Sequence, residues 1–140
     1  MLKTKLLHPE ILQALGSSGH GSQILIADGN YPYATCSPQT AKKVFLNLTP
    51  GLVKVMDVLN LLVDIIPIES ATVIVPPDGQ KQEIHDEFKK VLPQEINLKE
   101  LKRFDFYDAV KSPNTSLVIA TGEQRRFANI LLTIGVVKSS

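Results

Sequence analysis

Two residues able to handle protons and hydroxyl groups flank a short apolar run near the start of the chain. His20 lies between two glycines in the stretch SSGHGSQILIADGN, and Asp28 follows the run ILIA. Glycines leave the imidazole uncovered, and histidine gives or takes a proton near neutral pH. An apolar run of this length is typical of a buried strand. The pattern indicates either an acid–base pair at the two ends of a strand, or a loop histidine and a turn aspartate.

Further polar candidates occur in the second half of the chain. Arg103 opens RFDFYDAVK, where its fork of donors would bind a carboxylate, a phosphate or sugar hydroxyls, or would simply cover a core helix. Asn129 precedes the apolar run ILLTI, so its amide would orient a ligand or cap a turn. His85 is expected on a solvated helix face, where Asp86 and Lys90 have the spacing of an ion pair.

Cofactor and metal motifs are not indicated. Gly16, Gly19 and Gly21 precede a strand, whereas a dinucleotide-binding glycine motif follows a strand and opens a helix. The stretch ATGEQRR lacks the Lys-Ser/Thr of a P-loop. The chain has 3 histidines and 1 cysteine (Cys36), without the spacing of metal ligands, so we expect no metal site and no disulfide.

Length and composition predict a single domain spanning residues 1–140. Hydrophobic residues make up 44% of the chain and charged residues 21%, as in ordinary soluble globular proteins. The net charge is +1 and the basic residues are scattered, so no nucleic-acid partner is expected. The N-terminus lacks the apolar core of a signal peptide, and no apolar run is long enough to span a membrane. These features predict a cytoplasmic location.

The order of the expected elements indicates an α/β sandwich with a mainly parallel sheet flanked by helices. Strands are expected at residues 23–28, 43–48, 71–77, 116–122 and 128–137, and helices at 8–19, from Pro50 or Gly51 to before Pro67, 79–93 and 101–112. The second helix is apolar on most of its circumference, so one of its sides is a candidate subunit contact. In the last helix, Phe104, Tyr107 and Val110 are expected on one side.

Three stretches in a fixed order carry a resemblance to a known family. The runs GHGSQILIADGNYP, RFDFY and TGEQRRFANILLTIGVV together resemble the L-fucose mutarotase / D-ribose pyranase family. The resemblance covers nearly the whole chain and is strongest over residues 9–33 and 101–137. It implies an isomerase of carbohydrate metabolism, without a cofactor, that interconverts the cyclic forms of a free monosaccharide. It also implies a homo-oligomeric ring, often a decamer, with sites at the boundaries between subunits.

The resemblance assigns roles to individual residues. His20 matches the proton donor of the family, and Asp28 matches its sugar-binding aspartate. Arg103 matches the arginine of the fucose branch, where the ribose branch tends to have histidine. The substrate-binding segment of the family falls on Phe127, Ala128 and Asn129.

Position 127 departs from the family, which usually has tyrosine there. Phe127 lacks the hydroxyl, although its ring can still stack on a sugar. Tyr31, Tyr33 and Tyr107 are candidates to supply a hydroxyl from another direction. The first hypothesis is a mutarotase of L-fucose or a related sugar. The alternatives are a D-ribose pyranase-type enzyme, a non-catalytic monosaccharide-binding or regulatory protein, and an oligomeric scaffold with a vestigial pocket.

Overall fold

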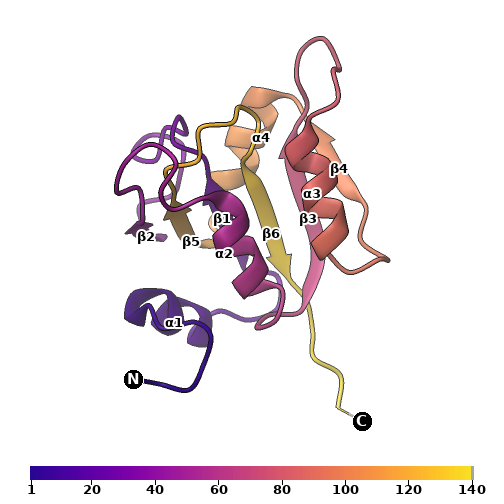
Figure 1. Cartoon of the computed structure of the whole chain (residues 1–140). Helices are drawn as coiled ribbons and strands as arrows, with labels where there is room; N and C mark the ends of the chain where they lie inside the picture. The colour runs from indigo at the N-terminus through magenta and orange to yellow at the C-terminus, as the bar shows by residue number, and fades with distance from the viewer. Residues whose placement is uncertain (140) are drawn as a thin grey trace.

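The five expected strands and one further strand form one six-stranded sheet with the order β2-β5-β1-β6-β3-β4 in the computed structural model, which describes residues 1–139 (Figure 1). The strands are β1 (Gln23–Ala27), β2 (Lys42–Phe45), β3 (Ile68–Ile74), β4 (Leu98–Leu101), β5 (Thr115–Ala120) and β6 (Ile130–Ile134). The helices are α1 (Pro9–Gly16), α2 (Val55–Leu62), α3 (Glu83–Val91) and α4 (Arg103–Val110). The predicted α/β fold class is confirmed.

Strand direction follows a simple rule with one exception. The pairs β1–β5, β2–β5 and β3–β4 are parallel, whereas β6 lies between β1 and β3 and is antiparallel to both. All strands except β6 therefore run in the same direction, which confirms a mainly parallel sheet. The carboxyl ends of β1, β3, β4 and β5 meet the amino end of β6 at one edge of the sheet.

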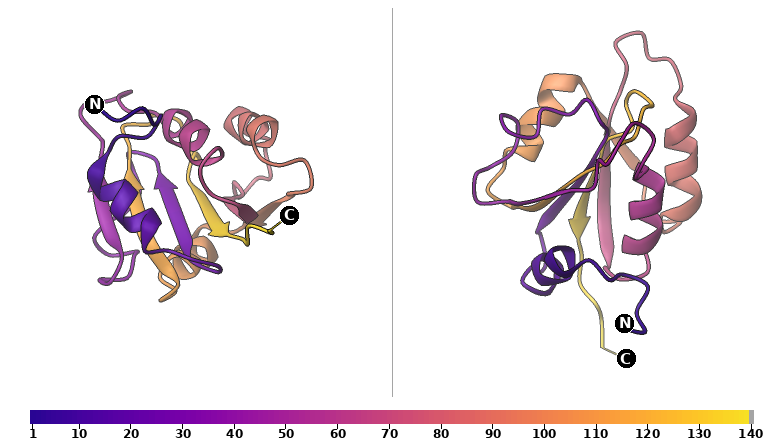
Figure 2. Two further views of the ribbon diagram at one scale, coloured as in Figure 1. Left: turned by 90° about the horizontal axis from the view of Figure 1, so that it is seen from below. Right: turned by 60° about the vertical axis from the view of Figure 1, so that its left-hand side comes forward.

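Both faces of the sheet are covered (Figure 2). Helices α1, α2 and α3 pack on one face, where they bury Ile24 and Ile26 of β1. Helix α4 and the segment 28–41 cover the other face and bury Leu25. Three consecutive strand residues are thus fully buried, which is typical of strands enclosed on both sides.

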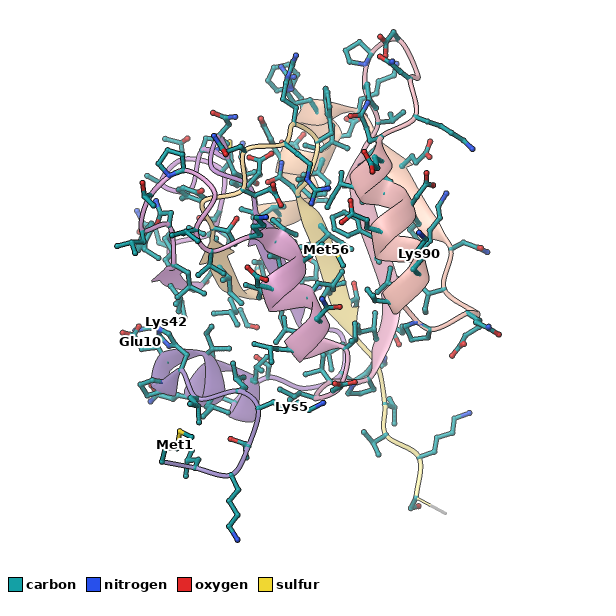
Figure 3. The ribbon with its side chains drawn as sticks, viewed as in Figure 1. Met1, Lys5, Glu10, Lys42, Met56 and Lys90 are labelled. Carbon is teal, nitrogen blue, oxygen red and sulfur yellow. The ribbon has the colours of Figure 1, made fainter. Side chains whose placement is uncertain are left out.

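Helix α1 is attached to the edge of the sheet by polar contacts. The Nδ1 atom of His8 accepts a hydrogen bond from the backbone N–H of Glu10, so His8 caps the helix. The carboxylate of Glu10 pairs with Lys42 of β2 at 2.7 Å (Figure 3).

Among the described residues, no helix has the length and apolar character needed to cross a membrane.

Three predicted elements differ from the observed ones. The expected helix from residue 50 or 51 is shorter, because α2 begins at Val55 after a turn in which the Asp57 carboxylate accepts from the Lys54 N–H. The expected helix 101–112 is preceded by β4, which was not predicted because LKEL lacks an apolar run. In α4 it is Phe106 that is buried, whereas Phe104 is 73% exposed.

Gly122 provides a test of the packing beside the sheet edge. It follows β5, donates its N–H to Val53 and accepts from Gly51, and a methyl group here would overlap the backbone carbonyl oxygens of Thr49 and Leu52. We expect Gly122→Ala to lower the free energy of unfolding by about 2 kcal/mol, measured by urea denaturation.

The matched control is Gly19→Ala, where an added methyl group meets nothing within 4 Å. Its free energy of unfolding should stay within about 0.5 kcal/mol of the wild-type value. Equal losses in the two variants would show that close packing at Gly122 is not the reason for its glycine.

Candidate active site

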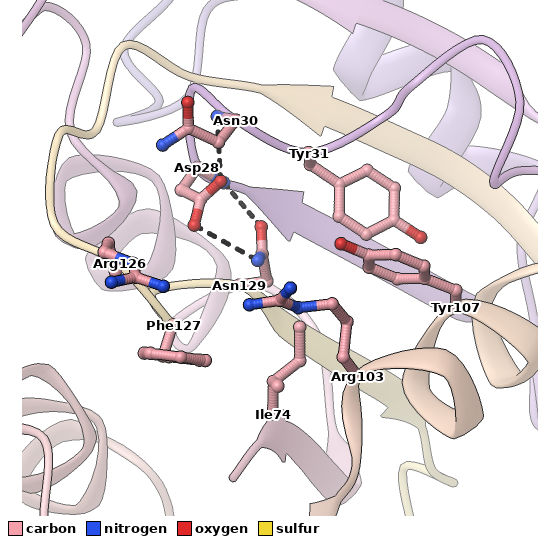
Figure 4. Close-up of a pocket in the computed structure, with 9 residues that line it drawn as sticks. All are labelled: Asp28, Asn30, Tyr31, Ile74, Arg103, Tyr107, Arg126, Phe127 and Asn129. Atoms are coloured by element: carbon pink, nitrogen blue, oxygen red, sulfur yellow. Dashed lines mark hydrogen bonds between the residues drawn. The ribbon is translucent and has the colours of Figure 1, made fainter. Parts of the chain in front are cut away.

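The strand ends at the carboxyl edge of the sheet form a pocket of about 260 Å³ (Figure 4). Asp28 follows β1, Ile74 ends β3, Arg103 lies just beyond β4 and Asn129 precedes β6. Ligands of α/β proteins commonly bind beyond the carboxyl ends of strands. The lining residues are Asp28, Asn30, Tyr31, Ile74, Arg103, Tyr107, Arg126, Phe127 and Asn129.

Asp28 and Asn129 hold each other in place at the base of the pocket. The backbone N–H of Asp28 donates to Oδ1 of Asn129 at 2.7 Å, and Nδ2 of Asn129 donates to Oδ2 of Asp28 at 3.2 Å. The N–H of Asn30 donates to the other carboxylate oxygen at 3.0 Å. These bonds fix both side chains and leave lone pairs on the carboxylate and one amide N–H for a ligand.

Burial opposes ionisation of Asp28. Its side chain is 4% exposed, and desolvation raises the pKa of the carboxyl group above its ordinary value. Hydrogen bonds from Asn30 and Asn129 offset part of this rise. A desolvated carboxylate of this kind accepts a hydrogen bond from a neutral hydroxyl strongly, because little water competes for it.

Phe127 has a left-handed backbone conformation, with φ of 59°, which is uncommon for a bulky residue. Its carbonyl oxygen lies 2.8 Å from Nε2 of His85, which is buried on α3. The prediction of a solvated His85 is wrong, and Asp86 and Lys90 form no ion pair in the described chain. His85 instead holds the backbone of the loop that carries Phe127, which we call the pocket loop. The spacing of residues along the helix does not indicate this role.

The pocket loop is also fixed by a neighbouring arginine. Arg125 pairs with Glu87 of α3, and its Nη2 atom lies 3.3 Å from Oε1 of the buried Glu123. These contacts set the direction in which the next residue, Arg126, leaves the backbone. Arg126 enters the pocket from the loop and Arg103 enters it from α4 (Figure 4).

The three tyrosines considered from the sequence differ in the use of their hydroxyls. Tyr31 donates to the carbonyl of Cys36, and Tyr33 donates to the carbonyl of Asp28. Burial raises the pKa of Tyr33 to about 12. Tyr107 lines the pocket, and its hydroxyl has no hydrogen-bond partner within residues 1–139. Tyr107 is therefore the tyrosine best placed to offer a hydroxyl to a ligand.

His20 lies at the opposite edge of the sheet from Asp28. Gly21, its neighbour, donates to the carbonyl of Ile134 at the end of β6, and β1 separates the two residues by about 16 Å of extended chain. The imidazole is exposed, and its Nε2 atom lies 3.0 Å from the carboxylate of Glu69 at the start of β3. The contact between His20 and Glu69 joins residues 49 positions apart, and no local pattern in the chain predicted it.

The structure therefore brings together most of the predicted site residues of one chain. Asp28, Arg103, Phe127 and Asn129 line the same pocket, whereas His20 is outside it. Ala128 is fully buried and packs into the core, so its backbone alone faces the site region. Arg126, in the stretch ATGEQRR, also lines the pocket and was not predicted as a site residue.

The chain is similar over nearly its whole length to proteins of one family. Residues 1–137 match the model of a family described as the RbsD / FucU transport protein family. A D-ribose pyranase of Variovorax paradoxus is 33% identical over 141 residues, covering 97% of this chain and 98% of that protein. A fucose mutarotase of Danio rerio is 31% identical over 147 residues, covering 94% and 90%.

A solved structure supports the fold match. RbsD of Bacillus subtilis complexed with D-ribose superposes with a TM-score of 0.85 and 26% identity, covering 99% of this chain and 100% of that chain. The relatives with similar identity carry two different activity names, so they do not decide between fucose and ribose.

His85 gives a pH dependence to the stability of the pocket loop. Burial lowers its pKa below the ordinary value of a histidine, more than the hydrogen bond to the Phe127 carbonyl and the nearby carboxylates of Glu100 and Asp86 raise it. The unfolded chain then binds a proton at a higher pH than the folded chain, so the free energy of unfolding falls as the pH drops below about 6.5. We expect His85→Gln to reduce this fall, measured by urea denaturation between pH 7.5 and 5.0.

The control is Phe88→Leu, which loosens the packing beside the His85 ring without removing a titratable group. Its free energy of unfolding should be lower at every pH, with the slope of the wild-type profile. A profile of His85→Gln parallel to the wild-type profile would contradict the assignment of the slope to the buried imidazole.

Proposed function

The chain belongs to the RbsD / FucU transport protein family, and we propose that it is a cofactor-independent mutarotase of a free monosaccharide, L-fucose or a related sugar. The observation that carries the proposal is the mutually bonded Asp28–Asn129 pair at the base of a small polar pocket. Fixed carboxylate and amide groups of this kind suit sugar hydroxyls, which both donate and accept hydrogen bonds. The relatives named D-ribose pyranase and fucose mutarotase support the same chemistry.

Mutarotation requires two coupled proton transfers. The bond between the anomeric carbon and the ring oxygen breaks, the ring oxygen gains a proton, and the anomeric hydroxyl loses one to give the open aldehyde. Reclosure on the other face reverses both transfers, so no proton is gained or lost overall. A group with a pKa near neutrality serves both directions, and fixing the sugar lowers the barrier further.

In the proposed mechanism, Asp28 accepts a hydrogen bond from one sugar hydroxyl, and the free N–H of Asn129 donates to a neighbouring oxygen. Arg103 donates to further oxygens from the α4 side, and the face of Phe127 packs on the sugar C–H groups. His20 gives a proton to the ring oxygen and takes up the proton that the anomeric hydroxyl releases, so the imidazole is regenerated, and Glu69 orients its ring.

The position of His20 requires a second copy of the chain in this mechanism. None of the described residues lining the pocket is a histidine, and His20 lies at the far edge of the sheet. We therefore propose a homo-oligomeric ring in which His20 of one copy enters the pocket of its neighbour. The His20 imidazole is exposed on its own chain, so it is accessible to a neighbouring copy, and Glu69 orients it.

A complementation experiment tests this arrangement. His20→Ala and Asp28→Ala should each abolish the acceleration of anomer exchange, measured by NMR magnetisation transfer between the anomeric protons of L-fucose or D-ribose. Because the two residues would come from different copies, unfolding and refolding an equal mixture of the variants should restore about one quarter of the wild-type activity.

Each refolded variant alone is the control, together with circular dichroism to show that the fold is intact. Exposure of His20 predicts that its loss leaves the fold unchanged. Inactive mixtures from well-folded variants would contradict the shared site, and unchanged exchange in His20→Ala would contradict the proton-transfer role.

The second candidate function is a non-catalytic monosaccharide-binding protein. The observation that favours it is Phe127, which offers no hydroxyl to a sugar where the family usually has tyrosine. The pocket would then bind the sugar through Asp28 and Asn129 without efficient proton transfer.

Phe127→Tyr separates the two functions. For a mutarotase, the wild-type protein accelerates anomer exchange, and the added hydroxyl changes the rate by less than about tenfold, since one hydrogen bond contributes about 1 kcal/mol. For a binding protein, saturation transfer detects bound sugar, but exchange is accelerated in the tyrosine variant alone. The Phe127→Leu variant serves as the control for removal of the ring without addition of a hydroxyl.

A further inference from the structure

Two arginines in the pocket have no acidic partner within residues 1–139 of their own chain. The guanidinium carbon atoms of Arg126 and Arg103 lie 5.2 Å and 6.0 Å from the centroid of the same Phe127 ring. Neither arginine forms an ion pair or a side-chain hydrogen bond within residues 1–139, whereas Arg125 pairs with both Glu123 and Glu87. Adjacent arginines of one loop thus differ: Arg125 fixes the loop, and Arg126 is left to face the pocket.

The nearby carboxylates are engaged elsewhere. Asp28 is bonded by Asn30 and Asn129, and Asp78, in the hollow next to Arg126, accepts from the N–H of Gln80. Figure 4 shows the two guanidinium groups pointing toward one another from the loop and from α4. A guanidinium over a ring uses its face there, so its in-plane N–H donors remain free for a ligand.

Two like charges beside one ring repel each other, and a neutral sugar does not relieve this repulsion. Helix α4 adds to the positive potential, because it begins at Arg103 without a side-chain cap. An anionic group between the two guanidinium groups would neutralise their positive charges and accept paired hydrogen bonds from them. The arrangement is that of an anion subsite within a hydroxyl-binding pocket.

We propose that the monosaccharide bound by this chain carries an anionic substituent, a carboxylate or a phosphate, held between Arg103 and Arg126. This inference rests on the proposed function, which requires a free anomeric carbon, and within it selects an anionic relative of L-fucose rather than L-fucose itself. The anion is then remote from the anomeric carbon, as in a hexuronate or a hexose 6-phosphate. Asp28 and Asn129 bind hydroxyls elsewhere on the same sugar.

A matched series of sugars that differ only at carbon 6 tests the inference. The probes are D-galactose, D-galacturonate and D-galactose 6-phosphate, with L-fucose as a further neutral sugar. Dissociation constants come from NMR titration at one low ionic strength, and anomer exchange is measured by magnetisation transfer on the same samples. We expect at least one anionic sugar to bind about tenfold or more tightly than D-galactose, with weaker preference at high salt.

Arg126→Gln removes one of the two charges. The ratio of anionic to neutral affinity should then fall by about tenfold, and Arg126→Lys should keep part of it, because a point charge replaces the fork of donors. The control is Lys90→Gln, which removes an exposed positive charge from α3, away from the pocket (Figure 3). The ratio of anionic to neutral sugar affinity in Lys90→Gln should equal that of the wild-type protein.

The two measurements separate this inference from the proposed function. Equal affinity for the charged and neutral sugars, or a ratio unaffected by Arg126→Gln, overturns the anion subsite whether or not exchange is accelerated. Tight, Arg126-dependent binding of an anionic sugar without faster exchange supports the subsite and contradicts the mutarotase function. Preference for the carboxylate or for the phosphate then identifies the anion.

Discussion

The antiparallel insertion of β6 between β1 and β3 is the constraint on which the pocket depends. Because β5 is parallel to β1, it ends at the same edge as Asp28, and because β6 is antiparallel, it begins there. The segment 121–129 therefore stays at one edge instead of crossing the sheet. Pairing of Ile26 with Ile130 then brings Asn129 beside Asp28, where the two side chains bond to each other. A parallel β6 would carry the loop and its arginines to the opposite edge.

Elements with continuous apolar runs could be predicted from the sequence, and those defined by tertiary pairing could not. ILIA and LVIA are apolar on both faces and became β1 and β5, whereas LKEL became β4 through its pairing with β3. Of the site, the resemblance indicated Asp28, Arg103 and Asn129, but local spacing did not show that His85 holds the Phe127 carbonyl from 42 positions away. Long-range hydrogen bonds of this kind have no periodic signature in a chain.

The length of β1 explains why a single chain does not combine its histidine with its aspartate. Five strand residues keep His20 and Asp28 at opposite edges, and both faces of the strand are packed, so neither residue approaches the other without loss of the core. Under the proposed function, proton transfer then depends on assembly, since the His20 imidazole and the hydroxyl-binding pair Asp28–Asn129 come from different copies. The apolar helix α2 is not required for this conclusion, because its buried residues Val55, Val58, Leu59 and Leu62 pack within the chain.

The electrostatics of Asp28 bear on the two pocket arginines. A guanidinium close to a carboxylate lowers the pKa of that carboxyl group, often strongly. For Asp28, burial raises the pKa, and hydrogen bonds from Asn30, Ala128, Tyr31 and Asn129 offset part of this rise. Within residues 1–139, no arginine forms an ion pair with its carboxylate, so the positive charge of Arg103 and Arg126 is not used to hold Asp28. Under the proposed anion subsite, a ligand that satisfies both the Asp28–Asn129 pair and the two arginines must carry hydroxyl groups together with an anionic group.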